Sequence, residues 1–146
     1  MKYYLLVVLA FLGAGCQLHD ENGLEAVDKA LTSWANAYFA YDYEEALKHL
    51  TPESEKWIRF AASNITEQDV RFINEHNKGV HIEITDHQPI IGDTACTARL
   101  RVTGYAQLGF TEQDNQVVDQ ADYQIALVMR DGEWLVKMEG PLQSGK

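Results

Sequence analysis

Apolar residues near the start of the chain follow the spacing of a helix. Between Gly23 and Tyr41 they recur in steps of three and four, at Leu24, Val27, Leu31, Trp34 and Tyr38. This spacing predicts a helix over 23–41 with one apolar stripe and polar side chains elsewhere. Because such a stripe must be buried, we expect the helix to pack on a larger surface.

Three short helices are predicted to follow, each opened by a residue that favours a helix N-terminus. These N-caps are Asp42, Thr51 and Thr66. Glu45 and Asp69 stand three residues after the first and last cap, which is the spacing of a capping box. Pro52 occupies the first helical position after Thr51, where its missing N–H costs nothing. The first short helix is expected over 43–50.

From Val80 onward the apolar period becomes two, which is the period of strands. The alternating sets are Val80, Ile82 and Ile84; Cys96, Ala98, Leu100 and Val102; Tyr123, Ile125, Leu127 and Met129; Trp134, Val136 and Met138. Asp131-Gly132 predicts a two-residue hairpin turn. Gly104 and Gly109 indicate a bulge or bend in a long strand.

The opposite face of these strands carries charge. Arg99 and Arg101 are expected to form a cross-strand ladder with Glu83, Lys137 and Glu139. An antiparallel sheet with one wet face shows this alternation. The sequence therefore predicts an α+β fold, with N-terminal helices packed on a curved antiparallel sheet of about four strands.

The first fifteen residues have the pattern of an export signal. Lys2 is followed by an apolar run and then by Gly13-Ala14-Gly15, directly before Cys16. This junction resembles the lipobox of bacterial lipoproteins, whose cysteine is acylated, with palmitate for example, and becomes the new N-terminus. Leu12 stands one place earlier than the usual lipobox leucine, so ordinary signal-peptidase cleavage stays open. We expect a leader over 1–15, a lipidated tether over 16–22, one domain over 23–141 and a tail over 142–146.

Export and acylation would place the protein on the bacterial envelope, with the membrane as a partner through the lipid on Cys16. No Asp follows that cysteine, which favours the outer membrane in the best-known sorting rule of the family. The formal net charge is −10, and no basic run is present, so a nucleic-acid partner is not expected. The oligomeric state is not predicted.

The order of elements resembles the nuclear-transport-factor-2-like superfamily, a cystatin-like cone of bent sheet closed by helices. The residues that carry the resemblance are the first helix running into Tyr41-Asp42-Tyr43-Glu44-Glu45-Ala46, the Leu50-Thr51-Pro52-Glu53-Ser54 junction and the Gly132-x-Trp134 hairpin. Within it, the chain is similar to secreted lipoproteins of Gram-negative bacteria. Some superfamily members are isomerases or cyclases with an acid or base inside the cone.

Few residues of this chain are candidates for such chemistry. By strand parity the inner sheet face holds no acid, and His49 is the weak catalytic candidate. No metal site or cofactor is expected, since the histidine spacings fit no ligand pair. Cys96 alternates with core residues, so we expect a buried, unreactive thiol. If the cone holds a ligand, the expected lining is Trp34, Tyr38, Leu100, Tyr123, Ile125 and Trp134.

Two functions follow from these expectations. The favoured one is a non-catalytic domain that binds a small apolar ligand or an envelope protein. The alternative is a small envelope enzyme of the isomerase or hydrolase kind that uses the cone pocket. A cone filled by its own aromatic side chains would argue against both ligand binding and catalysis.

Overall fold

The computed structural model describes residues 18–89 and 94–142. In these residues, α-helices are followed by an antiparallel sheet with the strand order β1-β2-β3-β4. The helices are α1 (Leu18–Phe39), α2 (Tyr43–Leu47), α3 (Glu55–Ser63) and α4 (Glu67–His76), with a 3-10 turn at Pro52–Ser54. The strands are β1 (His81–Pro89), β2 (Ala95–Gln107), β3 (Gln116–Arg130) and β4 (Glu133–Lys137), with a 3-10 turn at Glu112–Asp114. The predicted α+β architecture is confirmed.

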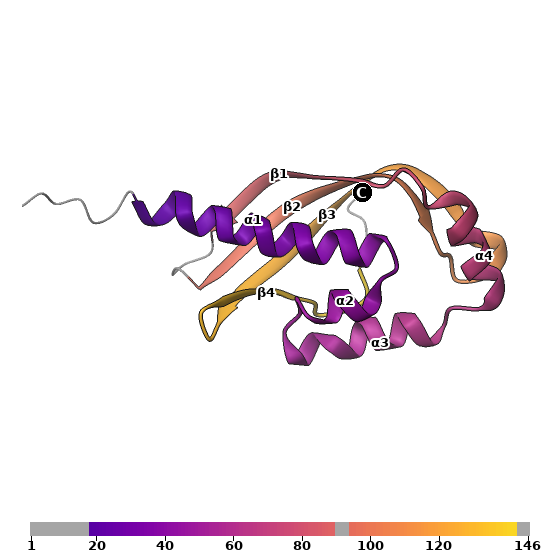
Figure 1. Ribbon diagram of the computed structural model, residues 1–146, viewed down its shortest axis with the longest axis horizontal. Coiled ribbons are helices and arrows are strands. Elements are labelled where there is room, and N and C mark those ends of the chain that lie inside the picture. The colour runs from indigo at the N-terminus through magenta and orange to yellow at the C-terminus, as the bar shows by residue number, and fades with distance from the viewer. Residues whose placement is uncertain (1–17, 90–93, 143–146) are drawn as a thin grey trace, which may run out of the picture.

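The sheet is curved and does not close on itself, and α1 lies across its concave side (Figure 1). The short strand β4 pairs with β3 only from Ala126 to Arg130. α4 lies at the far end of the molecule from the start of α1, beside the long bent ends of β2 and β3. The leader and Cys16 lie outside the described residues.

The helix α1 has the predicted stripe but not the predicted ends. Val27, Leu31 and Trp34 are buried, whereas Leu24, in the N-terminal part of the helix, is 38% exposed. The helix begins at Leu18, so it extends into the range expected to be a tether, and it ends at Phe39.

The predicted caps are found in part. Thr66 and Asp69 form a full capping box at the start of α4. Asp42 caps α2 by accepting from Glu45 N at 3.1 Å, but the Glu45 carboxylate bonds Lys48 instead of closing the box. α2 ends at Leu47 rather than at residue 50, because the next residues pair with β4: Val136 N donates to His49 O at 2.8 Å.

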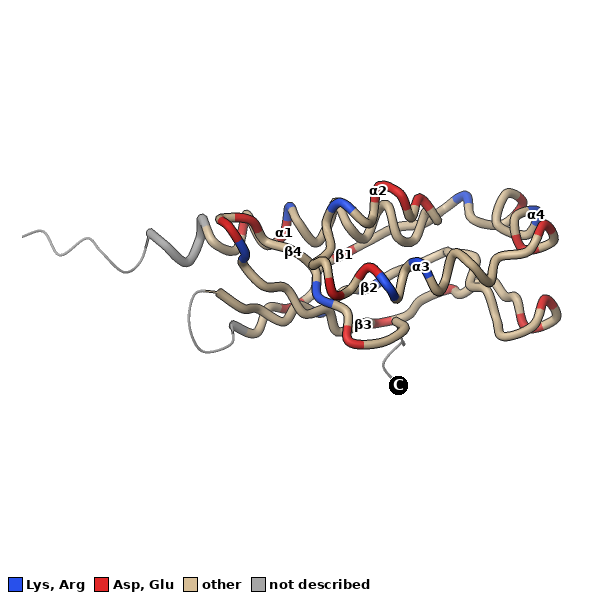
Figure 2. Tube along the Cα trace, turned by 90° about the horizontal axis from the view of Figure 1, so that it is seen from below, with Lys and Arg blue, Asp and Glu red and all other residues tan. Residues whose placement is uncertain are grey.

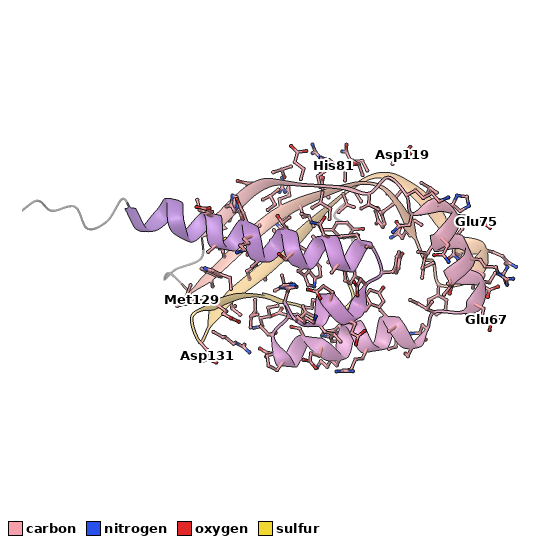
Figure 3. All side chains as sticks on the ribbon, in the orientation of Figure 1. Glu67, Glu75, His81, Asp119, Met129 and Asp131 are labelled. Carbon is pink, nitrogen blue, oxygen red and sulfur yellow. The ribbon has the colours of Figure 1, made fainter. Side chains whose placement is uncertain are left out.

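The strand parity places the core as predicted. The buried residues that follow the predicted alternation are Cys96, Ala98, Leu100, Val102, Tyr123, Ile125, Leu127 and Val136 of the strands, and Met138 just after β4. His81 and Asp119 project from the opposite, outer side of the sheet (Figure 3). On that outer side Arg101 pairs with Asp122 at 3.0 Å and lies opposite Glu83 in the register. The predicted ladder was wrong in β4, because the ion pair that Lys137 forms within the described residues is with Glu139 of its own segment, at 3.7 Å.

Two glycines shape the sheet. Gly104 has a φ of +65°, and a Cβ there would lie 2.8 Å from the Gly79 carbonyl oxygen. The register between β2 and β3 runs on across it, so Gly104 bends the strand without a bulge, and the buried set changes phase to Tyr105 and Ala106. Asp131 and Gly132, with φ of 52° and 80°, form the predicted hairpin turn.

Candidate functional site

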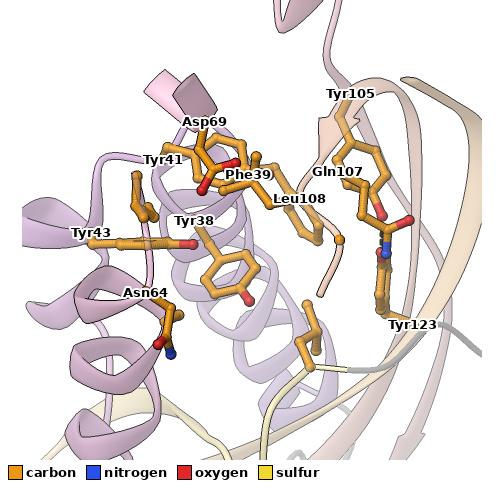
Figure 4. A pocket seen from close by; sticks show the side chains of 14 residues that line it. Tyr38, Phe39, Tyr41, Tyr43, Asn64, Asp69, Tyr105, Gln107, Leu108 and Tyr123 are labelled. Atoms are coloured by element: carbon orange, nitrogen blue, oxygen red, sulfur yellow. Dashed lines mark hydrogen bonds between the residues drawn. The ribbon is translucent and has the colours of Figure 1, made fainter. Parts of the chain in front are cut away.

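A cavity of about 230 Å³ lies at the C-terminal end of α1, where α1, α2, α3, α4, β2 and β3 meet. Six of its fourteen lining residues are aromatic: Tyr38, Phe39, Tyr41, Tyr43, Tyr105 and Tyr123. Figure 4 shows Tyr41 and Tyr43 on one side, Tyr105 and Tyr123 on the other, and Tyr38 between them. The aromatic side chains therefore surround a space rather than fill it.

The C-terminal end of α1 and the turn after it position the first group of aromatic rings, Tyr38, Tyr41 and Tyr43. Tyr41 has a φ of 61°, and Asp42 N donates to Ala37 O at 2.9 Å while Tyr41 N donates to Tyr38 O at 3.1 Å. This is the hydrogen-bond pattern of a Schellman motif, with tyrosine where glycine is usual. A left-handed tyrosine costs about 1–2 kcal/mol. The Tyr41 hydroxyl donates to Ala106 O at 2.5 Å, which fixes the ring against β2.

The bend of β2 at Gly104 positions Tyr105 beside Tyr123, and these two form the second group of aromatic rings. Tyr105 turns inward after the bend, and its hydroxyl is hydrogen-bonded to that of Tyr123 on β3. The Phe39 ring lies against both, with centroids 5.3 Å from each. Asn77 links the end of α1 to β2, because its side-chain amide donates to Phe39 O at 2.9 Å and accepts from Ala106 N at 2.9 Å.

The tyrosine hydroxyls are neutral at physiological pH. Burial raises the pKa of Tyr38 to about 12, with a further contribution from Tyr105. Burial likewise raises the pKa of Tyr41, Tyr43 and Tyr123. Within the described residues, the hydroxyls of Tyr38 and Tyr43 have no hydrogen-bond partner, so both are available to a ligand.

One carboxylate lines the same cavity. Asp69 is 7% exposed. Its burial raises the pKa, but the hydrogen bonds from Asn115 and from Thr66 outweigh burial, and the pKa is lowered on balance. Asn115 Nδ2 donates to Oδ1 at 2.8 Å, and Thr66 N donates to Oδ2 at 3.0 Å. Asp69 is therefore an ionised carboxylate with both oxygens engaged.

The sequence-based search for an inner acid missed Asp69, because it considered only the sheet. The capping box was predicted, but nothing in the pattern placed α4 at the mouth of the cavity. The aromatic cluster from Tyr38 to Tyr43 is visible in the sequence, and it was the available signal for Phe39, Tyr41 and Tyr43. Tyr105 was missed because the strand changes phase at Gly104.

The six residues predicted to line a ligand pocket separate in the structure. Tyr38 and Tyr123 line the cavity. Trp34 and Leu100 are fully buried in the core beneath it, and Ile125 lines a second hollow of about 220 Å³ between β3 and the segment after β4. Trp134 lies at the edge of the core, and its indole Nε1, like that of Trp34, is buried with no hydrogen-bond partner.

The remaining candidates lie elsewhere. His49 is half-buried, 3.4 Å from Glu45, and is not among the residues that line the cavity. Cys96 is buried, and burial raises the pKa of its thiol. Over residues 18–89 and 94–142 no three metal-ligating side chains come together, and no helix there has the length and apolarity to span a membrane. Leu142, assigned to the tail, packs on the core and lines the cavity.

No protein-family model and no curated protein matches the sequence. The fold is similar to the solved structure of a function-unknown protein from Mycobacterium tuberculosis, with a TM-score of 0.59 and 12% sequence identity. The alignment covers 92% of this chain and 78% of that one. At this identity the likeness is one of fold alone.

Proposed function

We propose that this protein is an envelope-anchored lipoprotein whose nuclear-transport-factor-2-like domain binds a small organic ligand without transforming it. The observation that carries the proposal is the cavity between α1 and the bent sheet, with aromatic walls and neutral hydroxyls directed at its interior. The curved sheet covered by helices supports the family proposal, and the leader before Cys16 supports the anchor.

The size of the cavity limits the ligand. An apolar cavity of about 150 Å³ accepts benzene. At about 230 Å³ this one fits a molecule of that size or somewhat larger. Because the cavity is partly open to solvent, this volume describes the part of the ligand held inside: one or two rings, or a branched group of similar bulk.

The titration behaviour of the lining favours binding over catalysis. A general acid or base works best with a pKa near the working pH. The pKa of Asp69 is lowered and the pKa values of the tyrosines are raised, so both kinds of group move away from neutrality. The alternative isomerase or hydrolase would have to work with these unfavourable values.

A pair of neighbouring substitutions on α3 tests the proposal. Ala61 lines the cavity, whereas Ala62 is exposed on the same helix. Ala61→Phe should fill the cavity, and Ala62→Phe should leave it open. The full chain, purified in a maltoside detergent, is incubated with a bacterial lipid and metabolite extract and measured by native mass spectrometry.

A small-molecule adduct on the wild type and on Ala62→Phe, absent from Ala61→Phe, is the expected result. No adduct on a folded wild-type protein would overturn the proposal, as would an adduct that Ala61→Phe retains. Conversion of the bound compound into a product would favour the enzyme instead.

A further inference from the structure

We propose that the ligand of this cavity is an organic cation with a methylated ammonium group, which the tyrosine rings and the Asp69 carboxylate would hold together. This inference rests on the proposed function, because it names the chemical class that the cavity takes. It follows from the ring geometry, from the charges around the cavity and from the hydrogen bonds that Asp69 already makes.

The rings are arranged so that their faces stay accessible. Tyr38 and Tyr43 are tilted by 44° with centroids 5.6 Å apart, and Tyr41 and Tyr43 by 57° at 5.8 Å. No two of these three rings stack face to face, and Trp34 stacks on one face of Tyr38. Tyr41, Tyr43 and the other face of Tyr38 can therefore present π-electron density to the cavity. A cation over such a face gains about 0.5–1 kcal/mol when exposed and about 2 kcal/mol when desolvated.

The charges around the cavity favour a cation and disfavour an anion. Among the described lining residues there is no Lys, Arg or His, while the buried carboxylate of Asp69 is present. The negative charge of Asp69 acts on the lining of the cavity, because it contributes to the raised pKa of the Tyr41 hydroxyl. An anionic ligand would face this carboxylate with no basic partner.

The surroundings of the cavity extend the same negative field. The chain from Val102 to Met129, which includes the long bent hairpin, contains no basic residue. Its acids are Glu112, Asp114 and Asp119, together with Asp122, whose charge is neutralised by its ion pair with Arg101. Figure 2 shows acidic positions at the hairpin tip and on α4, where Glu67, Asp69 and Glu75 outnumber Arg71, at the end of the molecule that holds the cavity. Such a field attracts cations toward the site.

The state of the Asp69 carboxylate selects the kind of cation. A primary ammonium group is strongly hydrated and needs acceptors to replace its water. Both carboxylate oxygens already accept hydrogen bonds, from Asn115 and from Thr66. Each oxygen therefore has one of its acceptor positions in use. A methylated ammonium needs no hydrogen bond, so it gains the full attraction of the charge without competing for the remaining positions.

An isosteric pair of probes separates charge from shape. Choline and 3,3-dimethylbutan-1-ol have the same branched outline, but only choline carries a positive charge. Titration calorimetry on the full chain in maltoside detergent should give choline at least tenfold tighter binding, which corresponds to about 1.4 kcal/mol. Equal affinity for both probes would overturn the cation and leave the ligand-binding function standing.

Two sets of variants test the groups that would hold the cation. Tyr43→Leu removes a ring face and Tyr43→Phe removes only the hydroxyl, so the leucine variant should weaken choline binding at least fivefold more. Asp69→Asn should reduce choline affinity about tenfold and leave the alcohol unaffected. Asp119→Asn changes the net charge equally at an exposed position outside the cavity, and should change choline affinity less than twofold.

Circular dichroism identifies any variant that fails to fold, and the Tyr43 pair does not depend on the Asp69 cap. Similar losses in Tyr43→Leu and Tyr43→Phe would point to a hydrogen bond and overturn the inference. If neither probe binds the wild type, the cation is excluded, while the extract experiment still decides whether the cavity binds a ligand at all.

Discussion

Trp34 is a completely buried side chain whose indole N–H donor is not hydrogen-bonded within the described residues. Its side chain is fully buried, it stacks on Tyr38 with centroids 4.9 Å apart, and its Nε1 has no acceptor within the described residues. An unpaired buried donor costs about 1–3 kcal/mol. The packing of this ring under the cavity therefore stabilises the fold in spite of its N–H group.

We predict that Trp34→Ala lowers the free energy of unfolding by about 3–5 kcal/mol, because it removes a large ring from the core. Trp34→Phe should cost much less, since it keeps most of the apolar bulk and removes the unpaired donor. Urea denaturation of both variants measures the difference. A loss below about 1 kcal/mol in Trp34→Ala would contradict the assignment of this residue to the core.

Cys96 is the second residue whose role follows from burial alone. It is 4% exposed, and burial, together with the charge of Asp28, raises the pKa of its thiol. We predict that it resists alkylation by iodoacetamide in the native protein and reacts once the chain is unfolded in guanidinium. Cys96→Val should cost about 1 kcal/mol of stability through packing. Rapid native alkylation would show that this end of β2 opens in solution.

At the scale of elements, the periodic interiors of helices and strands could be predicted from the sequence, and their ends could not. The parity of β2, β3 and β4 identified the buried face, because alternation continues wherever a strand is regular. α1 ended two residues early because Tyr41 adopts a left-handed conformation, which no periodicity encodes.

The candidate site lies at those irregular points, which explains why most of it was missed. Tyr41 follows the end of α1, Tyr105 follows the bend at Gly104, and Asp69 is a cap residue at the start of α4. Tyr38 and Tyr123 were predicted because they lie inside regular elements. Predicting the site also required the tertiary structure, because the packing of α4 beside β2 is what brings Asp69 to the tyrosines.

Gly104→Ala tests the bend directly. The substitution adds a Cβ at a φ of +65° and 2.8 Å from the Gly79 carbonyl oxygen, so both strain and a clash arise. Gly132→Ala serves as the control, because its φ is +80° but no atom lies within 4 Å of the added Cβ. Strain alone costs about 1–2 kcal/mol. We therefore expect Gly104→Ala to lower the thermal midpoint clearly more than Gly132→Ala, and equal shifts would contradict the close approach to Gly79.

At the scale of the whole molecule, the sequence predicts attachment to a membrane through Cys16. We predict that Cys16→Ser moves the protein from the membrane fraction to the soluble fraction, because small residues and an export leader precede Cys16. Fractionation with detection by immunoblot measures the change, and metabolic labelling with a palmitate analogue should mark only the wild type. A wild-type protein already in the soluble fraction would favour ordinary signal cleavage.

The length and direction of α1 determine how far from the membrane such an anchor would hold the cavity. The helix has 22 residues, begins just after Cys16 and ends at the cavity, so it rises about 33 Å along its axis. An acyl chain on Cys16 would place the membrane near the N-terminal end of α1, with the cavity at the opposite end of this helix. Surface charge is screened over about 8 Å at physiological ionic strength. With α1 perpendicular to the membrane, the cavity would then take up solutes of the aqueous compartment, beyond the reach of the potential of the lipid head groups.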